Sequence, residues 1–169
     1  TRKMNEKCFQ IFDIDDTLII HGQGSQNYYN TVNNDFRKFL EKKKFDKVYV
    51  YTNGTYGHGY NIVNHLNIHD MVSFIYGRDN LKPILFPKHM KPHKASFKFV
   101  NSSILYDSGA YDKNIIPEIY FFDDLKSNLE TAKSIGWKTI LIQPNNEIKE
   151  YYIDHVFSNI YGALLNLQI

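Results

Sequence analysis

Three carboxylates and one hydroxyl stand within five positions near the start of the chain. Asp13, Asp15, Asp16 and Thr17 come at the end of an apolar run that begins at Cys8. Gathering so many like charges at the end of a buried strand is costly unless a cation or a proton offsets them. A divalent metal ion is the natural counter-charge, so these residues predict a metal-dependent site.

Polar residues also stand at the ends of later apolar runs. Thr52 and Asn53 end the second run, and Asp123 and Asp124 end the fourth. Lys91 stands directly before a proline that opens a predicted helix. Carboxylates from two strands, a hydroxyl and a lysine that converge on one pocket suit a hard cation and a phosphate group.

Apolar runs alternate with amphipathic stretches along the chain, and this order positions the polar residues. Continuous apolar runs that are each followed by a helix indicate a parallel sheet covered on both faces. Ligands bind such sheets at the carboxyl ends of the strands. The sequence therefore predicts a doubly wound α/β sandwich. Its predicted strands are 8–14, 48–51, 72–76, 119–122 and 138–142, and its predicted helices are 25–44, 54–65, 92–101, 125–135 and 161–167.

These motifs, in this order, resemble the four motifs of the haloacid-dehalogenase (HAD) superfamily of phosphohydrolases. The matching residues are Asp13-x-Asp15-x-Thr17, Thr52, Lys91 and Asp123-Asp124. The resemblance covers residues 9–144, and the run 121–130 is particularly similar to small magnesium-dependent phosphatases and to the pyrimidine-nucleotidase branch. It implies a Rossmann-like, three-layer α/β/α sandwich with a central parallel sheet.

The resemblance also implies a role for each motif residue. Asp13 is the expected nucleophile, which attacks phosphorus to form an aspartyl-phosphate. Asp15 is expected to protonate the leaving oxygen and then to deprotonate the water, aided by neighbouring charges that raise its pKa. Thr52 and the backbone amide of Asn53 are expected to hold phosphoryl oxygens. Lys91 is expected to neutralise the nucleophile and the developing charge.

The metal implied by the resemblance is Mg²⁺. Its expected protein ligands are Asp13, the backbone carbonyl of Asp15 and an acid of the last motif. Side-chain alternation lets only one of Asp123 and Asp124 point into the site, with a slight preference for Asp123.

Several residues have competing interpretations. Lys94 competes with Lys91, which is preferred because a proline at the first helical position would fix Lys91 at the helix entrance. Asp16 and Thr17 are also typical turn caps, and the Thr17 hydroxyl is expected to fix the loop. The histidines lack the spacing of a zinc site. The glycine-rich segment 53–59 is neither a Walker loop nor a dinucleotide fingerprint, and it is expected to let backbone approach phosphate.

Only about 34 residues separate Thr17 from Thr52, which leaves no room for a cap domain. The resemblance then points to the capless group, which often acts on large substrates or exposed phosphates. The stretch 78–89 carries Lys82, Phe86, Lys88 and His89. It is expected to be either a substrate-contacting loop or a plain connection.

Composition sets the broad class of protein. With 169 residues, 43% of them hydrophobic and 22% charged, the chain is expected to fold as one domain over 1–169. A net charge of +2 is too small for a dedicated nucleic-acid binder, so nucleic acid is only a secondary partner. The chain has no apolar run of ~20 residues and no signal peptide, and its single cysteine, Cys8, fits a reducing compartment. A soluble cytoplasmic protein is expected.

The leading functional hypothesis is a Mg²⁺-dependent phosphomonoesterase acting on a phosphorylated small molecule, nucleotide or macromolecule. The alternative is a nucleotidase or nucleic-acid end phosphatase, in which aromatic side chains stack on a base. A non-catalytic phosphate-binding protein is disfavoured because every expected catalytic residue is present. A dehalogenase is disfavoured because Asp15 is what phosphoryl transfer needs. The candidate stacking residues are Tyr28, Tyr29, Tyr56, Tyr60 and Phe86.

Overall fold

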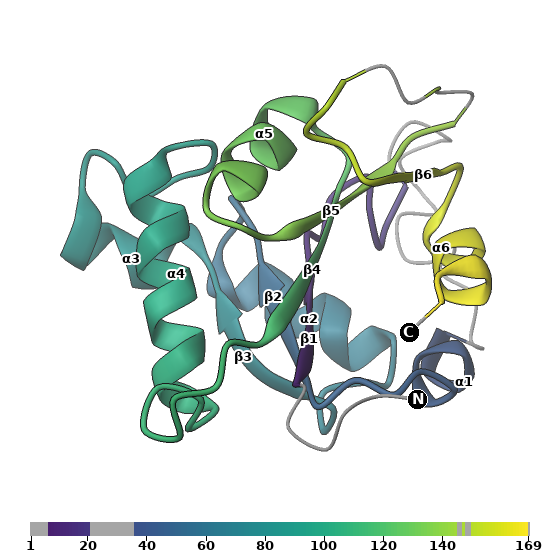
Figure 1. The fold of residues 1–169 in the computed structure, drawn as a ribbon, viewed down its shortest axis with the longest axis horizontal. Helices are drawn as coiled ribbons and strands as arrows, with labels where there is room; N and C mark the ends of the chain where they lie inside the picture. The colour runs from purple at the N-terminus through teal and green to yellow at the C-terminus, as the bar shows by residue number, and fades with distance from the viewer. Residues whose placement is uncertain (1–6, 21–35, 145–146, 148–149, 169) are drawn as a thin grey trace.

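The structure is a computed structural model that describes residues 7–20, 36–144, 147 and 150–168 (Figure 1). Strands and helices alternate through most of this part of the chain. The strands are β1 (Cys8–Phe12), β2 (Lys47–Tyr51), β3 (Val72–Tyr76), β4 (Glu118–Asp123), β5 (Lys138–Ile142) and β6 (His155–Phe157). The helices are α1 (Phe36–Glu41), α2 (Tyr56–His65), α3 (Arg78–Leu85), α4 (Lys94–Asp107), α5 (Lys126–Ser134) and α6 (Ile160–Asn166).

The described strands form one parallel sheet in the order β3-β2-β1-β4-β5-β6. From β1 the chain winds outward through β2 to β3, then crosses back to β4 and winds outward on the other side. The winding direction therefore reverses between β1 and β4, and the carboxyl ends of strands at such a switch point are where doubly wound sheets bind ligands. The predicted doubly wound α/β sandwich is confirmed.

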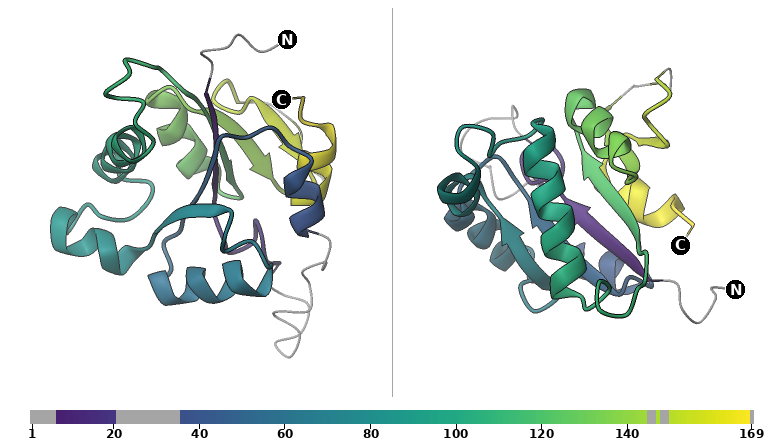
Figure 2. Two further views of the ribbon diagram at one scale, coloured as in Figure 1. Left: turned by 90° about the horizontal axis from the view of Figure 1, so that it is seen from below. Right: turned by 60° about the vertical axis from the view of Figure 1, so that its left-hand side comes forward.

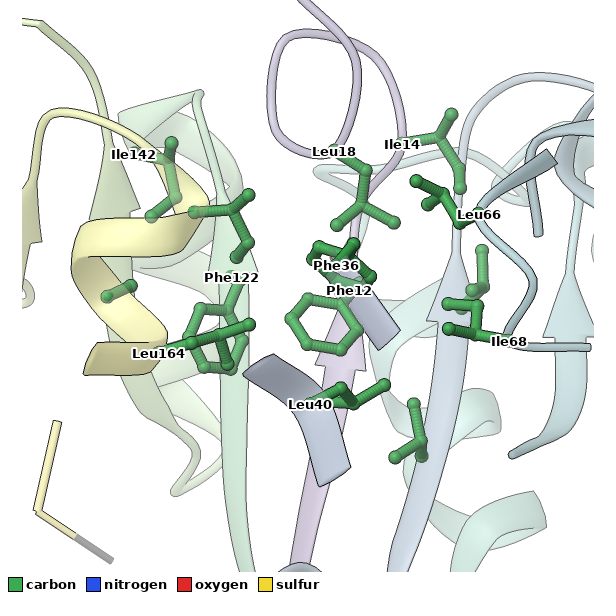
Figure 3. Packing of buried hydrophobic residues seen from close by; sticks show 14 of the residues in the cluster. Phe12, Ile14, Leu18, Phe36, Leu40, Leu66, Ile68, Phe122, Ile142 and Leu164 are labelled. Carbon is green, nitrogen blue, oxygen red and sulfur yellow. The ribbon is translucent and has the colours of Figure 1, made fainter. Parts of the chain in front are cut away.

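Helices cover both faces of the sheet, so its central strands are buried on both sides and all five residues of β1 are buried. Figure 1 shows α4 on one side and α1 and α6 on the other, and Figure 2 shows the same layers from two further directions. Side chains alternate between the two cores because strand residues point to opposite faces in turn. Phe12 packs in the core under α1, α2 and α6 (Figure 3), whereas Ile11 packs in the core under α4 and α5.

The described residues contribute only to this sandwich, in agreement with the predicted capless arrangement. None of the helices described in residues 7–20, 36–144, 147 and 150–168 is long and apolar enough to cross a membrane. Whether the whole of 1–169 folds as one domain stays a prediction.

Two elements were not predicted. The stretch from residue 78 was expected to be irregular, yet Arg78–Leu85 forms α3. Asn80 stabilises the start of this helix, because its side chain accepts a hydrogen bond from the Gly77 N–H and donates one to the Ile75 carbonyl. Strand β6 has only three residues, none of them fully buried, so it leaves no apolar run to detect.

Helix boundaries were the least accurate part of the prediction. The helix expected over 92–101 is α4, which begins two residues later and continues to Asp107, just before Gly109 with φ 72°. The helix expected over 25–44 corresponds to α1, which ends at Glu41; residues 25–35 lie outside the described part of the chain. Helix α5 ends before Gly136, whose φ of 92° is the left-handed conformation that glycine adopts at helix ends, as expected.

Candidate active site

The turn after β1 places the first motif at the carboxyl edge of the sheet. The Ile14 carbonyl accepts hydrogen bonds from the N–H groups of Thr17, Leu18 and Ile19, and Asp16 has a φ of 59°. The Thr17 hydroxyl donates to Asp13 Oδ2 at 3.2 Å. This contact agrees with the predicted loop-fixing role of Thr17, because the hydroxyl ties the turn to the side chain of Asp13.

Lys91 lies at the centre of the site and is only 5% exposed. Its ammonium donates to Asp13 Oδ1 at 3.0 Å, to Asp123 Oδ2 at 2.8 Å and to the Tyr51 carbonyl at 2.9 Å. Lys94, the competing lysine, is exposed at the start of α4. The structure therefore brings Lys91 to the carboxylates. The predicted reason was wrong, because α4 begins at Lys94 and the proline after Lys91 lies before the helix.

Asn53 holds the backbone of Lys91 in place. Its side-chain amide donates to the Lys91 carbonyl at 3.0 Å and accepts from the Lys91 N–H at 2.9 Å. Sequence reasoning assigned only the backbone amide of Asn53 to phosphate binding and missed this side-chain clamp. The clamp joins the end of β2 to the segment before α4, so the lysine reaches the strand ends without belonging to a strand or helix.

Asp123 and Asp124 end β4, the strand across the switch point from β1. Asp123 is fully buried, and both of its oxygens are occupied. Oδ1 accepts from the Leu125 N–H at 2.9 Å, and Oδ2 accepts from Asn128 Nδ2 at 3.1 Å as well as from Lys91. Asp124 is partly exposed. One carboxylate oxygen each from Asp13, Asp123 and Asp124 lie within 4.8 Å of one another.

The three carboxylates share one ammonium, and this imbalance governs their pKa values. Burial raises the pKa of Asp13 well above its ordinary value, and the charge of Asp123 raises it further against the opposing effect of Lys91. Burial and the charge of Asp123 raise the pKa of Asp124 to about 6. Burial opposes the charge of Lys91, but Asp123 and Asp13 outweigh it and raise the pKa of this lysine. When all three carboxylates are ionised, one ammonium leaves two negative charges, which one divalent cation would balance.

Thr52 and the start of α2 lie on the side of the site formed by the end of β2. Thr52 is buried, and its hydroxyl accepts a hydrogen bond from the Gly54 N–H at 3.0 Å. A Cβ atom at Gly54 would lie 3.2 Å from this hydroxyl oxygen, closer than most real contacts, so a larger residue there would require a small shift of the Thr52 side chain. Helix α2 then begins two residues on, and its N-cap residue Thr55 accepts a hydrogen bond from the His58 N–H at 3.1 Å.

His58 is a residue that sequence reasoning placed in no site. Its Nε2 lies 3.0 Å from Asp15 Oδ1, although the two residues are 43 positions apart. Its distance from Thr52 in the sequence was a weak indication of a place in the site. A residue on the first turn of a helix that begins at the strand ends can face those strand ends. His58 was considered only as a zinc ligand. Among the described residues, the histidines join no group of three metal-ligating side chains, whereas the three aspartates do.

The chain has the fold of the HAD superfamily. No family model matches the sequence, and no curated protein matches it either. Among solved structures, the HAD-hydrolase YfnB from Bacillus subtilis, bound to magnesium, matches with a TM-score of 0.66 at 12% identity over 97% of this chain and 100% of that one.

Two further structures show the range of proteins that share this fold. D,D-heptose 1,7-bisphosphate phosphatase from B. bronchiseptica, complexed with magnesium and phosphate, matches with a TM-score of 0.63 at 13% identity over 95% of this chain and 97% of that one. L-2-haloacid dehalogenase from Xanthobacter autotrophicus matches with a TM-score of 0.61 at 13% identity over 94% and 96%. The fold is therefore common to a phosphatase and a dehalogenase, and the chemistry must be argued from the site.

Proposed function

We propose that this protein is a hydrolase of the HAD type and, more specifically, a Mg²⁺-dependent phosphomonoesterase that works through an aspartyl-phosphate on Asp13. The observation that carries the proposal is the contact of the Asp13 carboxylate with Lys91 beside Asp123 and Asp124, at the switch point of the sheet. A carboxylate nucleophile needs a cationic neighbour that stays charged when the phosphate dianion arrives, and the raised pKa of Lys91 provides it.

The reaction proceeds in two displacements. An oxygen of Asp13 attacks phosphorus, the bond from phosphorus to the ester oxygen breaks, and that oxygen takes a proton from Asp15. Water then attacks the same phosphorus and gives a proton back to Asp15, and the bond between phosphorus and the Asp13 oxygen breaks to release phosphate. Lys91 balances the growing charge in both steps, while Thr52 and the amide of Asn53 bind phosphoryl oxygens.

The donor set fits a divalent cation. We infer that Asp13, the backbone carbonyl of Asp15 and Asp124 would hold Mg²⁺, which when bound neutralises and orients the phosphoryl group. The two uncompensated charges of the cluster support this assignment. Asp124 is preferred over Asp123, the reverse of the sequence-based preference, because Asp123 is fully buried and its two oxygens accept three hydrogen bonds, whereas Asp124 is partly exposed.

The decisive test is Asp13→Asn, which removes the attacking oxygen but keeps the shape of the side chain. We expect phosphate release from an aryl phosphate to fall below a few per cent of wild type while the melting temperature stays that of a folded protein. The matched control is Asp16→Asn, a neighbouring acid whose left-handed backbone conformation asparagine tolerates. Substantial turnover by Asp13→Asn would refute Asp13 as the nucleophile.

Metal dependence is tested on the same substrate. EDTA should abolish turnover and Mg²⁺ should restore it. Ca²⁺ should support turnover poorly, because it prefers six to eight oxygens at longer distances. Undiminished turnover in EDTA after dialysis would contradict the metal assignment while leaving the Asp13 result intact.

A nucleotidase or nucleic-acid end phosphatase is the second candidate, favoured by the charge of one segment. Residues 80–106 contain five lysines, two histidines and no acidic residue, and Lys91 belongs to this segment. Phe86 is 68% exposed, with the Lys82 ammonium 5.6 Å from its ring centroid and the His89 ring 5.9 Å away. An exposed ring among cations is typical of surfaces that stack bases and contact a phosphate backbone.

This second candidate is tested with the double variant Lys82→Ala, Lys88→Ala. KM for a phosphorylated oligonucleotide should rise, more so at low salt, while KM for an aryl phosphate stays unchanged because the small ester does not reach α3. The matched control is Lys113→Ala, Lys138→Ala; Lys138 is the first residue of β5 and so lies at the amino-terminal ends of the parallel strands, opposite the site. An unchanged KM for every nucleotide or oligonucleotide substrate would leave only the general phosphomonoesterase.

A further inference from the structure

The contact between His58 and Asp15 has no part in the proton transfers described above. Nε2 of His58 and Oδ1 of Asp15 are 3.0 Å apart, and the two side chains are 28% and 39% exposed. Asp13 and Asp123, by contrast, have Lys91 as their partner. The two aspartates of the first motif are therefore held by different cationic or potentially cationic groups, from different parts of the chain.

The local structure of α2 directs the histidine toward Asp15. The hydrogen bond from the His58 N–H to the Thr55 hydroxyl fixes the first turn of the helix. At Gly54, a Cβ atom would lie 3.2 Å from His58 Cδ2 and 3.8 Å from Asp15 Oδ2. The bare backbone at this position thus leaves the space in which imidazole and carboxylate meet.

A second brace holds the start of α2 from the side of α3. The Tyr56 N–H donates to Asp79 Oδ1 at 2.7 Å. Gly77 packs so close to this amide that a Cβ atom there would lie 2.5 Å from the Tyr56 nitrogen, which no real side chain permits. With the helix start fixed to α3 and capped by Thr55, the imidazole of His58 has a defined place at the rim of the site.

We propose that His58 is a positioning residue for Asp15, an inference that rests on the proposed function. When Asp15 is ionised, the Nε2–H of His58 donates to Oδ1 and fixes the plane of the carboxylate, so that Oδ2 is the oxygen that faces the ester. The proton given to the leaving group comes from Oδ2, and the water returns a proton to the same oxygen. No proton passes through His58 in either step.

Positioning matters here because Asp15 lies on a turn and is more than a third exposed. A carboxylate that rotates freely spends little time aligned with the ester oxygen, and misplacement by 1 Å can cost ~10²-fold in rate. The effect should depend on how much the leaving group needs a proton. An alkoxide needs one, whereas nitrophenolate leaves without one.

The test compares His58→Leu and His58→Gln on an alkyl phosphate and on nitrophenyl phosphate. We measure kcat/KM, which covers only the steps up to departure of the leaving group. His58→Leu should lose roughly 10–100-fold on the alkyl ester and less than about 3-fold on the nitrophenyl ester. His58→Gln should restore most of the loss, because its amide Nε2–H can reach the place of the imidazole Nε2–H.

Two further comparisons make the result decisive. His65→Leu, at the other end of α2, is the matched control and should behave as wild type. In an Asp15→Ala background, His58→Leu should cause no further loss, because it acts only through Asp15; general damage to the fold would instead add to the first loss. Equal losses on the two esters, or additive losses in the double variant, would overturn the role of His58. A wild-type protein that hydrolyses neither ester would overturn the proposed function itself.

Discussion

Two clusters of charged side chains place the same kinds of groups in opposite surroundings. At the carboxyl edge of the sheet, Lys91 is shared by the buried Asp13 and Asp123. On the surface, Arg37 of α1 donates to both oxygens of Asp70, at 2.6 and 2.9 Å, and to Glu41 at 2.8 Å. Each of these two clusters has more carboxylates than cations. In the buried cluster the carboxylates come from two separate strands and lie close together.

The difference shows in the direction of the pKa shifts. Hydrogen bonds from Arg37 lower the pKa of Asp70 to about 2, because this exposed carboxylate keeps its water and gains a cation. Burial raises the pKa of Asp13 and Asp124 despite the nearby ammonium of Lys91. The ionised form of the exposed Asp70 is therefore stabilised, whereas the one cation of the buried cluster does not offset the burial of its carboxylates. This shortfall of positive charge makes the buried cluster a candidate binding site for a cation.

The largest expected effect comes from removing the shared cation. Lys91→Met should lower the free energy of unfolding by about 3–5 kcal/mol, because it leaves two buried carboxylates without a cationic partner. It should also abolish turnover. Thermal melts in EDTA measure the first effect, and Arg37→Met in the surface cluster is the matched control, with a much smaller change. Equal losses from the two variants would show that burial does not distinguish the clusters.

The buried cluster should also respond to pH and to metal. Because the folded-state pKa of Asp124 is raised to about 6 from an ordinary 3.8, the folded protein binds more protons than the unfolded chain between these values. In EDTA its stability should therefore fall as the pH rises from about 4 to about 6, and Asp124→Asn should lessen this fall.

Mg²⁺ should reverse this penalty at neutral pH. Ligand at 100 times its dissociation constant stabilises the folded state by about 2.7 kcal/mol, and binding needs ionised carboxylates. The melting temperature of the wild type should thus rise with Mg²⁺ at pH 7 more than at pH 5, and that of Asp124→Asn should rise less. Glu118→Gln, at the other end of β4, is the control. A Mg²⁺ effect of the same size in Asp124→Asn would remove Asp124 from the metal ligands.

A smaller effect is expected where a buried polar group has no partner. Gln10, in the middle of β1, is fully buried, and neither its Nε2 nor its Oε1 has a hydrogen-bond partner among the described residues. Gln10→Leu should raise the free energy of unfolding by about 1–2 kcal/mol, because it removes an unsatisfied amide from the core at similar volume.

Thr139 provides the matched control for Gln10. It is equally buried, but its hydroxyl donates to the Tyr152 carbonyl and accepts from the Asp154 N–H. Thr139→Val should therefore lower the free energy of unfolding, whereas Gln10→Leu should raise it. Chemical denaturation measures both variants. If Gln10→Leu is less stable than the wild type, the Gln10 amide has hydrogen-bond partners in solution. Burial of this side chain would then not lower the stability of the protein.

The sequence predicted the parts of the fold whose signal is local. Strands β1 to β5 are continuous apolar runs, and their boundaries were predicted to within two residues. Helix α3 was missed because only Leu81 is buried in it and because Pro83 lies inside it, which disfavours a helix in sequence reasoning. Contacts with neighbouring elements hold this helix, from Asn80 to the Ile75 carbonyl of β3 and from Asp79 to the Tyr56 N–H of α2.

The candidate site divides in the same way. The spacing of the motifs predicted which residues would meet, and Asp13, Lys91, Asp123 and Asp124 do meet. The Asn53 clamp and the contact of His58 with Asp15 were not predictable, because each depends on the direction of a side chain from one element toward another. The roles of Asp15 and Thr52 in the reaction stay predictions.

The smallest expected effect belongs to the surface cluster. Asp70→Asn should lower the melting temperature only slightly, since exposed ion pairs contribute little. The sign of its pH dependence is opposite to that of the buried cluster. The pKa of Asp70 is about 2 in the folded protein against an ordinary 3.8, so its stabilising effect is present above about pH 4 and is lost as the pH falls toward 2.

The melting-temperature gap between wild type and Asp70→Asn should therefore shrink on acidification, and it should shrink at high salt because salt screens exposed charges. Glu41→Gln, which leaves the two-oxygen contact of Asp70 intact, should show a still smaller gap. A melting-temperature gap that persists at high salt or widens at low pH would mean that the Arg37 cluster, too, is shielded from solvent. Burial would then not distinguish it from the Lys91 cluster.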